Sequence, residues 1–123
     1  MSEEEQLKYL LKTLIREVKG ISSVMILAKE GLPIFELINE DHNSLHISAL
    51  SAILYKTAER LSLEGKKSYM DFVLIQNNDG KIMVFECGDE AYLSMFIEED
   101  ARLDLIFAAV KKTIKNIEEV LDF

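Results

Sequence analysis

SSVMILAKEGLPIFELI, at Ser22–Ile38, contains two β-rich runs on either side of a short polar turn. The runs are Ser23–Ala28 and Leu32–Ile38, and the three residues KEG separate them. Two such runs joined by a short segment that contains glycine predict a β-hairpin. Pro33 has no backbone N–H, so we expect the second strand at an edge of the sheet.

A helix is predicted on the N-terminal side of this hairpin. Residues 3–19 repeat apolar side chains at helical spacing, Ser2 is a candidate N-cap, and Gly20 ends the pattern. Acidic residues in the first turn suit the positive end of the helix dipole. The expected buried stripe is Leu7, Leu10 or Leu11, Leu14 and Val18.

A β-meander and a last helix are predicted on the C-terminal side. The three β-rich runs are Tyr69–Gln76, Lys81–Cys87 and Ala91–Ile97, joined by the turn sequences NNDG and CGDE. The last helix is expected to begin near Asp100, after the acidic sequence EED. Its expected buried stripe is Leu103, Ile106, Val110, Ile114, Ile117 and Leu121.

The segment between the hairpin and the meander predicts a long helix with apolar residues around much of its circumference. The polar loop Asn39–Ser44 ends in a good N-cap residue, and the helix is expected to continue to about Leu63. The stripe expected to face the sheet is Ile47, Leu50, Leu54, Ala58 and Leu61. The flanks hold Leu45, Ala49, Ala52, Ile53 and Tyr55, with Ser48, Ser51 and Ser62 among them. Apolar and small flanks indicate a second packing surface on this helix.

The resulting order of elements is αββαβββα, which predicts a single α+β domain over residues 1–123. A chain of this length buries about two thirds of the surface that it exposes when unfolded. The strands are apolar on both faces. We therefore expect the three helices to cover both sides of the sheet.

Charge argues against a nucleic-acid partner. The formal net charge is −8 and the pI about 4.8, so the average surface repels phosphate backbones and anionic membranes unless a local basic patch intervenes. The best candidate patch is Lys111, Lys112 and Lys115. Because Lys115 and Glu119 have i,i+4 spacing, this segment predicts a solvated helix face whose charges pair with each other.

The N-terminus and the cysteine content predict a cytoplasmic protein. MSEEEQ is acidic where a secretory leader is basic, and a single cysteine cannot form an internal disulfide. No apolar run approaches the roughly 20 residues that cross a bilayer. We expect no membrane insertion.

Neither a catalytic nor a cofactor site is complete in the sequence. Cys87 lies in CGDE, where glycine and aspartate suit a hairpin turn and a small apolar residue suits the strand end. His42 and His46, with Asp41 nearby, are the best candidate metal ligands, but no further ligand motif completes a shell. The isolated glycines form no phosphate-binding motif. We therefore expect a protein that is not an enzyme and has no cofactor.

Three short motifs carry a resemblance to a known family. They are the hairpin turn EGLP, the small-residue-rich helix sequence ISALSAILYKTAERLS, and the strand start GDEAYL. With these motifs the whole chain resembles the roadblock family of dynein light-chain-like proteins, including bacterial polarity regulators of the Mgl type. The family has the same element order, αββαβββα.

This resemblance implies a five-stranded antiparallel sheet with the central helix on one face and the two terminal helices on the other. It also implies a homodimer in which the third strands pair edge to edge and the central helices lie side by side. The implied dimer contacts are Tyr69, Asp71, Val73 and Ile75 in the strand and Ser48, Ala52 and Tyr55 in the helix. The implied partner contacts, on the same helix, are Ala49, Ile53, Lys56 and Arg60.

Family members act as platforms for small Ras-like GTPases or as subunits of motor complexes, so the resemblance implies a platform that binds and regulates such a GTPase. Any acceleration of hydrolysis would then use the GTPase's own residues, because the chain offers no obvious arginine finger. Two alternatives are a ligand-sensing domain of profilin-like or PAS-like topology and a structural dimerisation subunit of a larger complex. The bulky apolar residues at predicted inward positions count against a ligand cavity.

Overall fold

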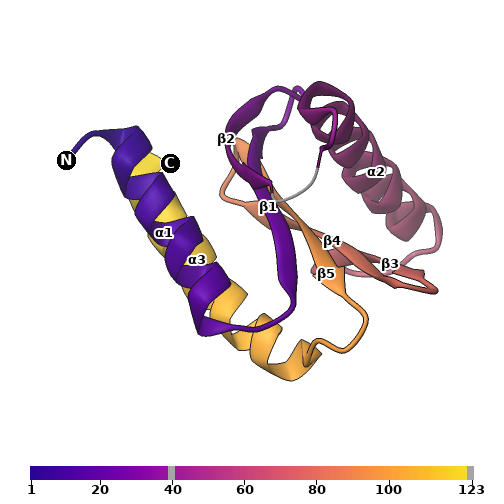
Figure 1. Cartoon of the computed structure of the whole chain (residues 1–123). Coiled ribbons are helices and arrows are strands. Elements are labelled where there is room, and N and C mark those ends of the chain that lie inside the picture. The colour runs from indigo at the N-terminus through magenta and orange to yellow at the C-terminus, as the bar shows by residue number, and fades with distance from the viewer. Residues whose placement is uncertain (39–40, 122–123) are drawn as a thin grey trace.

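The computed structural model describes residues 1–38 and 41–121, so Asn39 and Glu40 of the predicted polar loop lie outside the described residues. Its elements follow the predicted order αββαβββα (Figure 1). Their bounds are α1 Glu3–Glu17, β1 Ile21–Ala28, β2 Pro33–Ile38, α2 Ser44–Glu64, β3 Phe72–Asn77, β4 Gly80–Cys87, β5 Ala91–Glu98 and α3 Leu103–Leu121.

The five strands form one antiparallel sheet in the order β2-β1-β5-β4-β3. The β1-β2 hairpin and the β3-β4-β5 meander are both confirmed. They are joined by pairing of β1 with β5, in which Ile26 lies opposite Leu93. β2 and β3 are the two edges, so Pro33 lies on an edge strand as predicted.

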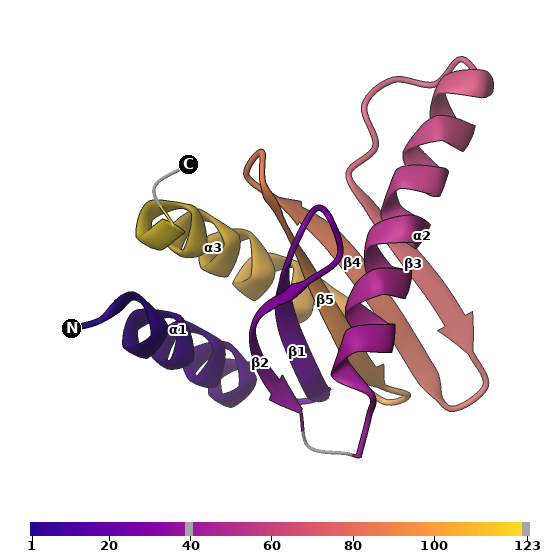
Figure 2. The same ribbon diagram turned by 90° about the horizontal axis from the view of Figure 1, so that it is seen from above.

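The helices cover both faces of the sheet. α1 and α3 lie side by side on one face and α2 lies alone on the other (Figure 2). α1 and α3 run antiparallel, because Gln6 and Tyr9 near the start of α1 line one surface groove with Asn116 and Val120 near the end of α3. This arrangement confirms the fold that the family resemblance implies.

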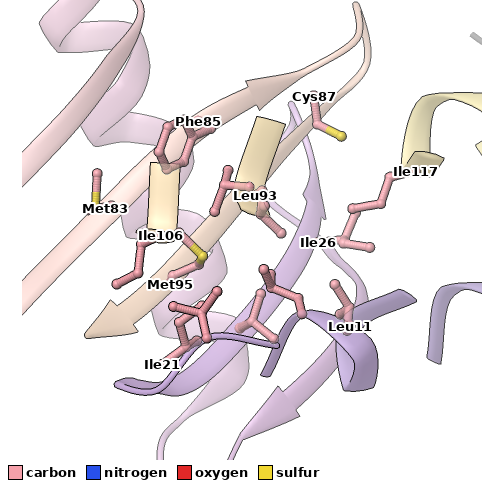
Figure 3. Close-up of a cluster of buried hydrophobic side chains, with 14 of the residues drawn as sticks. Leu11, Ile21, Ile26, Met83, Phe85, Cys87, Leu93, Met95, Ile106 and Ile117 are labelled. Atoms are coloured by element: carbon pink, nitrogen blue, oxygen red, sulfur yellow. The ribbon is translucent and has the colours of Figure 1, made fainter. Parts of the chain in front are cut away.

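The larger core lies between the sheet and the pair α1 and α3. In α1 the buried residues are Leu7, Leu11 and Leu14, which confirms the predicted stripe and selects Leu11 over Leu10. In α3 they are Ile106, Val110, Thr113 and Ile117. Figure 3 shows how this core joins α3 to the sheet, with Ile106 beside Met95 of β5.

The smaller core, under α2, contradicts the predicted sheet-facing stripe. The buried residues of α2 are Ser48, Ser51, Ala52 and Tyr55. Leu50 and Leu61 are instead 63% and 72% exposed. Ile47, Leu54 and Ala58 are half-buried. Small side chains let the helix approach the sheet closely, and the Ser48 hydroxyl donates to the Gly31 carbonyl at 2.6 Å. The large aliphatic side chains are displaced to a flank.

Some element ends differ from the predicted ones. α2 has Asn43, not Ser44, as its N-cap residue. β3 begins at Phe72, so Tyr69 and Asp71 precede the strand to which they were assigned. α3 begins at Leu103, a few residues after the acidic sequence EED.

Candidate interaction surface

α2 carries several large apolar side chains that the chain itself leaves open to solvent. The exposed members are Leu45, Leu50, Ile53, Leu61 and Leu63. A helix that packs on a sheet in a monomer normally places charged and polar residues on its outer side. Clustered exposed apolar residues of this kind mark an interaction site.

An apolar groove runs along the flank of α2 and has a volume of about 560 Å³. Its helical wall includes Leu50, Leu54 and Thr57. Its floor comes from the sheet, at Ile75 of β3, Ile82 of β4 and Phe96 of β5. The groove is therefore open on the side where the sheet ends.

β3 borders this groove and is a free edge of the sheet. Among the described residues it pairs only with β4, so the backbone groups on its other side are a template for another strand. Asn77 and Gly80 flank a two-residue turn, which places a hydrogen-bonded pair at the end of the ladder. By alternation, the N–H groups of Leu74 and Gln76 point away from β4. We call the groove together with this edge the α2–β3 face.

The opposite side of α2 is fixed to the rest of the chain. The hydroxyls of Ser51 and Ser94 lie 3.0 Å apart. The rings of Tyr55 and Tyr92 pack with centroids 4.7 Å apart. These contacts hold α2 in place while its β3 flank stays open.

A polar network centred on Glu86 ties the segment before β3 to the sheet. The Lys29 ammonium lies 2.5 Å from a Glu86 carboxylate oxygen, and the Tyr69 hydroxyl donates to the other oxygen. Burial by itself raises the pKa of Glu86, but the hydrogen bonds from Lys29 and Tyr69 outweigh it and lower that pKa. The same hydrogen bond raises the pKa of Tyr69 to about 12. The network therefore fixes how the chain leaves α2 and enters the edge strand.

The strand residues predicted for the dimer interface lie at or near the α2–β3 face. Val73 and Ile75 are half-buried in β3, and Ile75 lines the groove. Tyr69 and Asp71 are exposed just before the strand. The interface itself stays a prediction.

The helix residues predicted for the same interface lie elsewhere. Ser48, Ala52 and Tyr55 are buried against their own sheet, with exposed fractions of 3% or less, so they have no surface left for a partner. Leu50 and Leu54 occupy the open flank instead. The i,i+3,i+4,i+7 spacing of Ser48, Ser51, Ala52 and Tyr55 was a signal for the buried stripe, because small residues allow a close approach of helix and sheet.

The residues predicted to bind a partner lie on another flank of α2. Ala49, Ile53, Lys56 and Arg60 are all exposed, and their spacing along the helix places them in one row. Lys56 donates to a carbonyl in the turn between β1 and β2, so this residue faces away from β3, whereas Ile53 also lines the groove. The row predicted to bind a partner therefore meets the α2–β3 face at Ile53.

The candidate chemical residues Cys87 and His42 lie toward opposite ends of the β4-β5 pair. Cys87 is buried at the end of β4 as predicted, and burial together with the charge of Glu118 raises the pKa of its thiol to about 12. The His42 ring packs against Phe96 with centroids 4.9 Å apart, and His46 is exposed on α2. In the part of the chain that the structure describes, no group of three or more potential metal ligands occurs.

None of the helices within residues 1–38 and 41–121 combines the length and the apolar character needed to cross a membrane.

Comparisons with known proteins identify the fold and the family. A family model described as the Roadblock/LC7 domain matches residues 7–96. No curated protein matches the sequence. A Roadblock/LC7 domain from Streptomyces avermitilis superimposes with a TM-score of 0.85 at 17% identity, over 94% of this chain and 97% of that chain.

Two MglB structures are similar to the same extent. The gliding protein MglB from Thermus thermophilus gives a TM-score of 0.86 at 14% identity, over 98% of this chain and 91% of that chain. An MglB with a tetrameric arrangement gives a TM-score of 0.88 at 14% identity, over 98% of this chain and 90% of that chain. At these identities the structural matches establish the fold alone.

Proposed function

The chain belongs to the Roadblock/LC7 domain family, and from this premise we propose that it is a non-enzymatic homodimeric platform that binds and regulates a small Ras-like GTPase. The observation that carries the proposal is the α2–β3 face, where large apolar side chains and an unpaired strand edge lie together. An isolated chain would leave both exposed.

A second copy of the chain fits the α2–β3 face. Antiparallel pairing of two β3 edges about a two-fold axis perpendicular to the sheet extends the sheet and places both α2 helices on one side of it. Leu50 and Leu54 would then meet the α2 of the twin above the seam. The tetrameric arrangement of one MglB relative is in keeping with self-association through this fold.

The GTPase contact is assigned to the other flank of α2, the row Ala49, Ile53, Lys56 and Arg60. Ala49, Lys56 and Arg60 lie outside the lining of the groove, Ile53 also lines it, and the row combines apolar with basic groups. A recognition interface of standard size buries about 1,200–2,000 Å², which is more than one short helix face provides. Both protomers should therefore contribute, and monomeric variants should bind poorly.

Regulation in this proposal works through docking. The platform stabilises one arrangement of the GTPase switch segments, and the GTPase supplies the residues for hydrolysis. The Arg60 guanidinium lies 3.6 Å from the Glu64 carboxylate. We assign Arg60 to contact with the GTPase and not to catalysis.

Isothermal titration calorimetry tests this function. Ras-like GTPases from the same genome, loaded with GDP or a GTP analogue, would be titrated with the wild type, Arg60→Ala and Arg102→Ala. We expect nucleotide-sensitive binding that Arg60→Ala weakens about tenfold or more, as truncation of an interface anchor does. Arg102→Ala is the matched control, because Arg102 is also an exposed arginine in a surface ion pair and lies next to α3, away from α2.

Absence of binding to every GTPase, with the dimer intact, would overturn the GTPase assignment and leave a structural dimerisation subunit. A ligand-sensing role has less support, because the apolar groove of about 560 Å³ beside α2 is the surface that the second copy covers in this proposal. The small cavity beside Ser23 and Ser94 has a volume of only about 10 Å³, which is room for about one water molecule.

A further inference from the structure

The outer side of the layer formed by α1 and α3 carries a band of positive charge. The band consists of Lys12 and Arg16 on α1 and Lys111, Lys112 and Lys115 on α3, all exposed. Each helix turns its apolar stripe toward the sheet, so these cations face away from it. α1 and α3 lie side by side (Figures 1 and 2). Their outer sides therefore share one surface, and we call these five cations the basic band.

The acidic groups beside this band are Glu5, Glu17 and Glu119. Lys112 lies 3.7 Å from Glu17, and Arg16 contacts the Thr13 hydroxyl at 3.5 Å. Among the described residues Lys12, Lys111 and Lys115 form no ion pair, so the predicted pairing of Lys115 with Glu119 is not formed. Glu119 nevertheless lies one turn from Lys115 on the same face of α3.

The sequence places like charges at successive turns of both helices. Lys12 and Arg16 have i,i+4 spacing, and so do Lys111 and Lys115. Pairs of like charge at this spacing destabilise a helix, whereas alternating charges stabilise it. The arrangement works against the stability of the isolated chain and favours a partner that is negatively charged.

The band also runs against the charge of the protein as a whole. Five cations with Glu5, Glu17 and Glu119 give it a net charge of +2, which leaves −10 for the rest of a chain whose net charge is −8. At physiological ionic strength a charge is screened beyond about 8 Å, so acidic groups across the sheet act weakly on a surface that touches the band.

We propose that this band docks the protein peripherally on an anionic phospholipid bilayer. The surface suits a membrane because it consists of the neighbouring outer sides of two antiparallel helices. It is rich in lysine, and partly exposed apolar side chains lie beside the cations. Tyr9 and Leu105, at 59% and 49% exposure, are the largest of these on α1 and α3. A tyrosine ring with a polar tip and an apolar body suits the boundary between headgroups and acyl chains.

A nucleic acid fits this surface less well. α1 and α3 cover the sheet on the side that carries the band, so among the described residues no strand surface is open there on which bases can stack. Four of the five cations are lysines, whereas arginine is the residue that recognises phosphates and base edges with a bidentate fork. DNA binding is therefore treated as the competing outcome of the test.

The proposal does not require the homodimer. If the β3 edges do pair as proposed, the two-fold axis places both bands on the same side of the extended sheet. The number of cations facing the bilayer then doubles, and binding becomes tighter without any change in the band itself.

Vesicle co-sedimentation of the full chain tests the proposal. The vesicles are phosphatidylcholine alone and phosphatidylcholine mixed with phosphatidylglycerol, each at low and high salt. We expect binding only to the anionic vesicles, and a loss of that binding at high salt. Lys12→Gln/Lys111→Gln/Lys115→Gln should lower the partition coefficient by about a hundredfold, because each basic residue near an anionic surface contributes about fivefold.

Lys66→Gln/Lys67→Gln/Lys81→Gln is the matched control, since it removes the same charge outside the α1 and α3 layer. It should retain most of the binding, and circular dichroism should show that both variants fold. Equal loss in the two variants would overturn the proposal, as would the absence of binding to anionic vesicles. Band-dependent binding of a mixed-sequence DNA duplex without vesicle binding would also overturn it, in favour of a nucleic-acid partner.

Discussion

Leu50→Ser tests whether a second copy of the chain covers the α2–β3 face. In the single chain Leu50 is 63% exposed, so most of its apolar surface faces water. A serine at that position should change the unfolding free energy of a monomer by only about 0.5 kcal/mol, as surface substitutions do. In the proposed dimer the same side chain lies beside the seam, and its loss weakens association.

The size of this effect follows from the exposed fraction. Full burial of a leucine side chain contributes about 1.5–3 kcal/mol, so covering the exposed 63% of Leu50 contributes about 1–2 kcal/mol. A two-fold interface contains the residue twice, which gives about 2–4 kcal/mol for the dimer. The dimer dissociation constant should therefore rise by about 30-fold to 1,000-fold.

Sedimentation velocity over a range of concentrations measures this constant, and thermal unfolding followed by circular dichroism checks the fold. Leu105→Ser is the control, because Leu105 is 49% exposed on α3 and lies on the other side of the sheet. We expect the control to dimerise as the wild type does. An unchanged dissociation constant for Leu50→Ser, or a wild type that is monomeric at micromolar concentration, would refute the reasoning.

Three further substitutions probe the edge strand, the polar network and the buried thiol. Gln76→Pro removes an N–H that points away from β4, so light scattering should show a weaker dimer of a protein with an unchanged circular dichroism spectrum; an equally stable dimer would exclude β3 pairing. The lowered pKa of Glu86 contributes stability that is present above pH 4.5 and lost as the pH falls through the folded-state pKa. Urea unfolding at several pH values should therefore show that the unfolding free energy of Glu86→Gln falls less steeply with acidification than that of the wild type. An equal pH dependence in the two proteins would contradict this. Cys87→Ser should lower the unfolding free energy by about 0.5–3 kcal/mol and leave GTPase binding intact, and loss of binding by the folded variant would show that the thiol has a functional role.

The order of elements was predictable because its signals are local. The turn sequences KEG, NNDG and CGDE separate strands that are only a few residues apart, and all three turns are present. The Ser2 cap and the leucine stripe of α1 are equally local, and both are confirmed. The pairing of β1 with β5 is different, because it joins residues about 70 positions apart and no local signal in the sequence predicts it.

The sheet-facing side of α2 was predicted wrongly because hydrophobic periodicity assumes that the most apolar stripe is buried in the same chain. α2 has two candidate stripes, one of large aliphatic residues and one of small residues with Tyr55. The small residues face the sheet, where Ser51 reaches Ser94 and Ser48 reaches Gly31. Periodicity does not distinguish apolar surface that a chain buries itself from apolar surface that it keeps for a partner.

The basic band could not be found from any single stretch of sequence. Arg16 and Lys111 are about 100 residues apart, and each lies near acidic residues along the chain. Only the antiparallel packing of α1 and α3 brings the two groups of cations together, and only the side-chain positions show that Lys115 does not pair with Glu119.

The two proposed surfaces lie on opposite sides of one sheet, and this separation has a physical consequence. α2 and its flanks face one way, and the outer sides of α1 and α3 face the other (Figure 2). A two-fold axis perpendicular to the sheet keeps this division in the dimer, because it returns each face to its own side. A bilayer on the basic band would therefore leave the row from Ala49 to Arg60 directed away from the membrane. The dimer could then hold a GTPase and a bilayer at the same time without competition between their contacts.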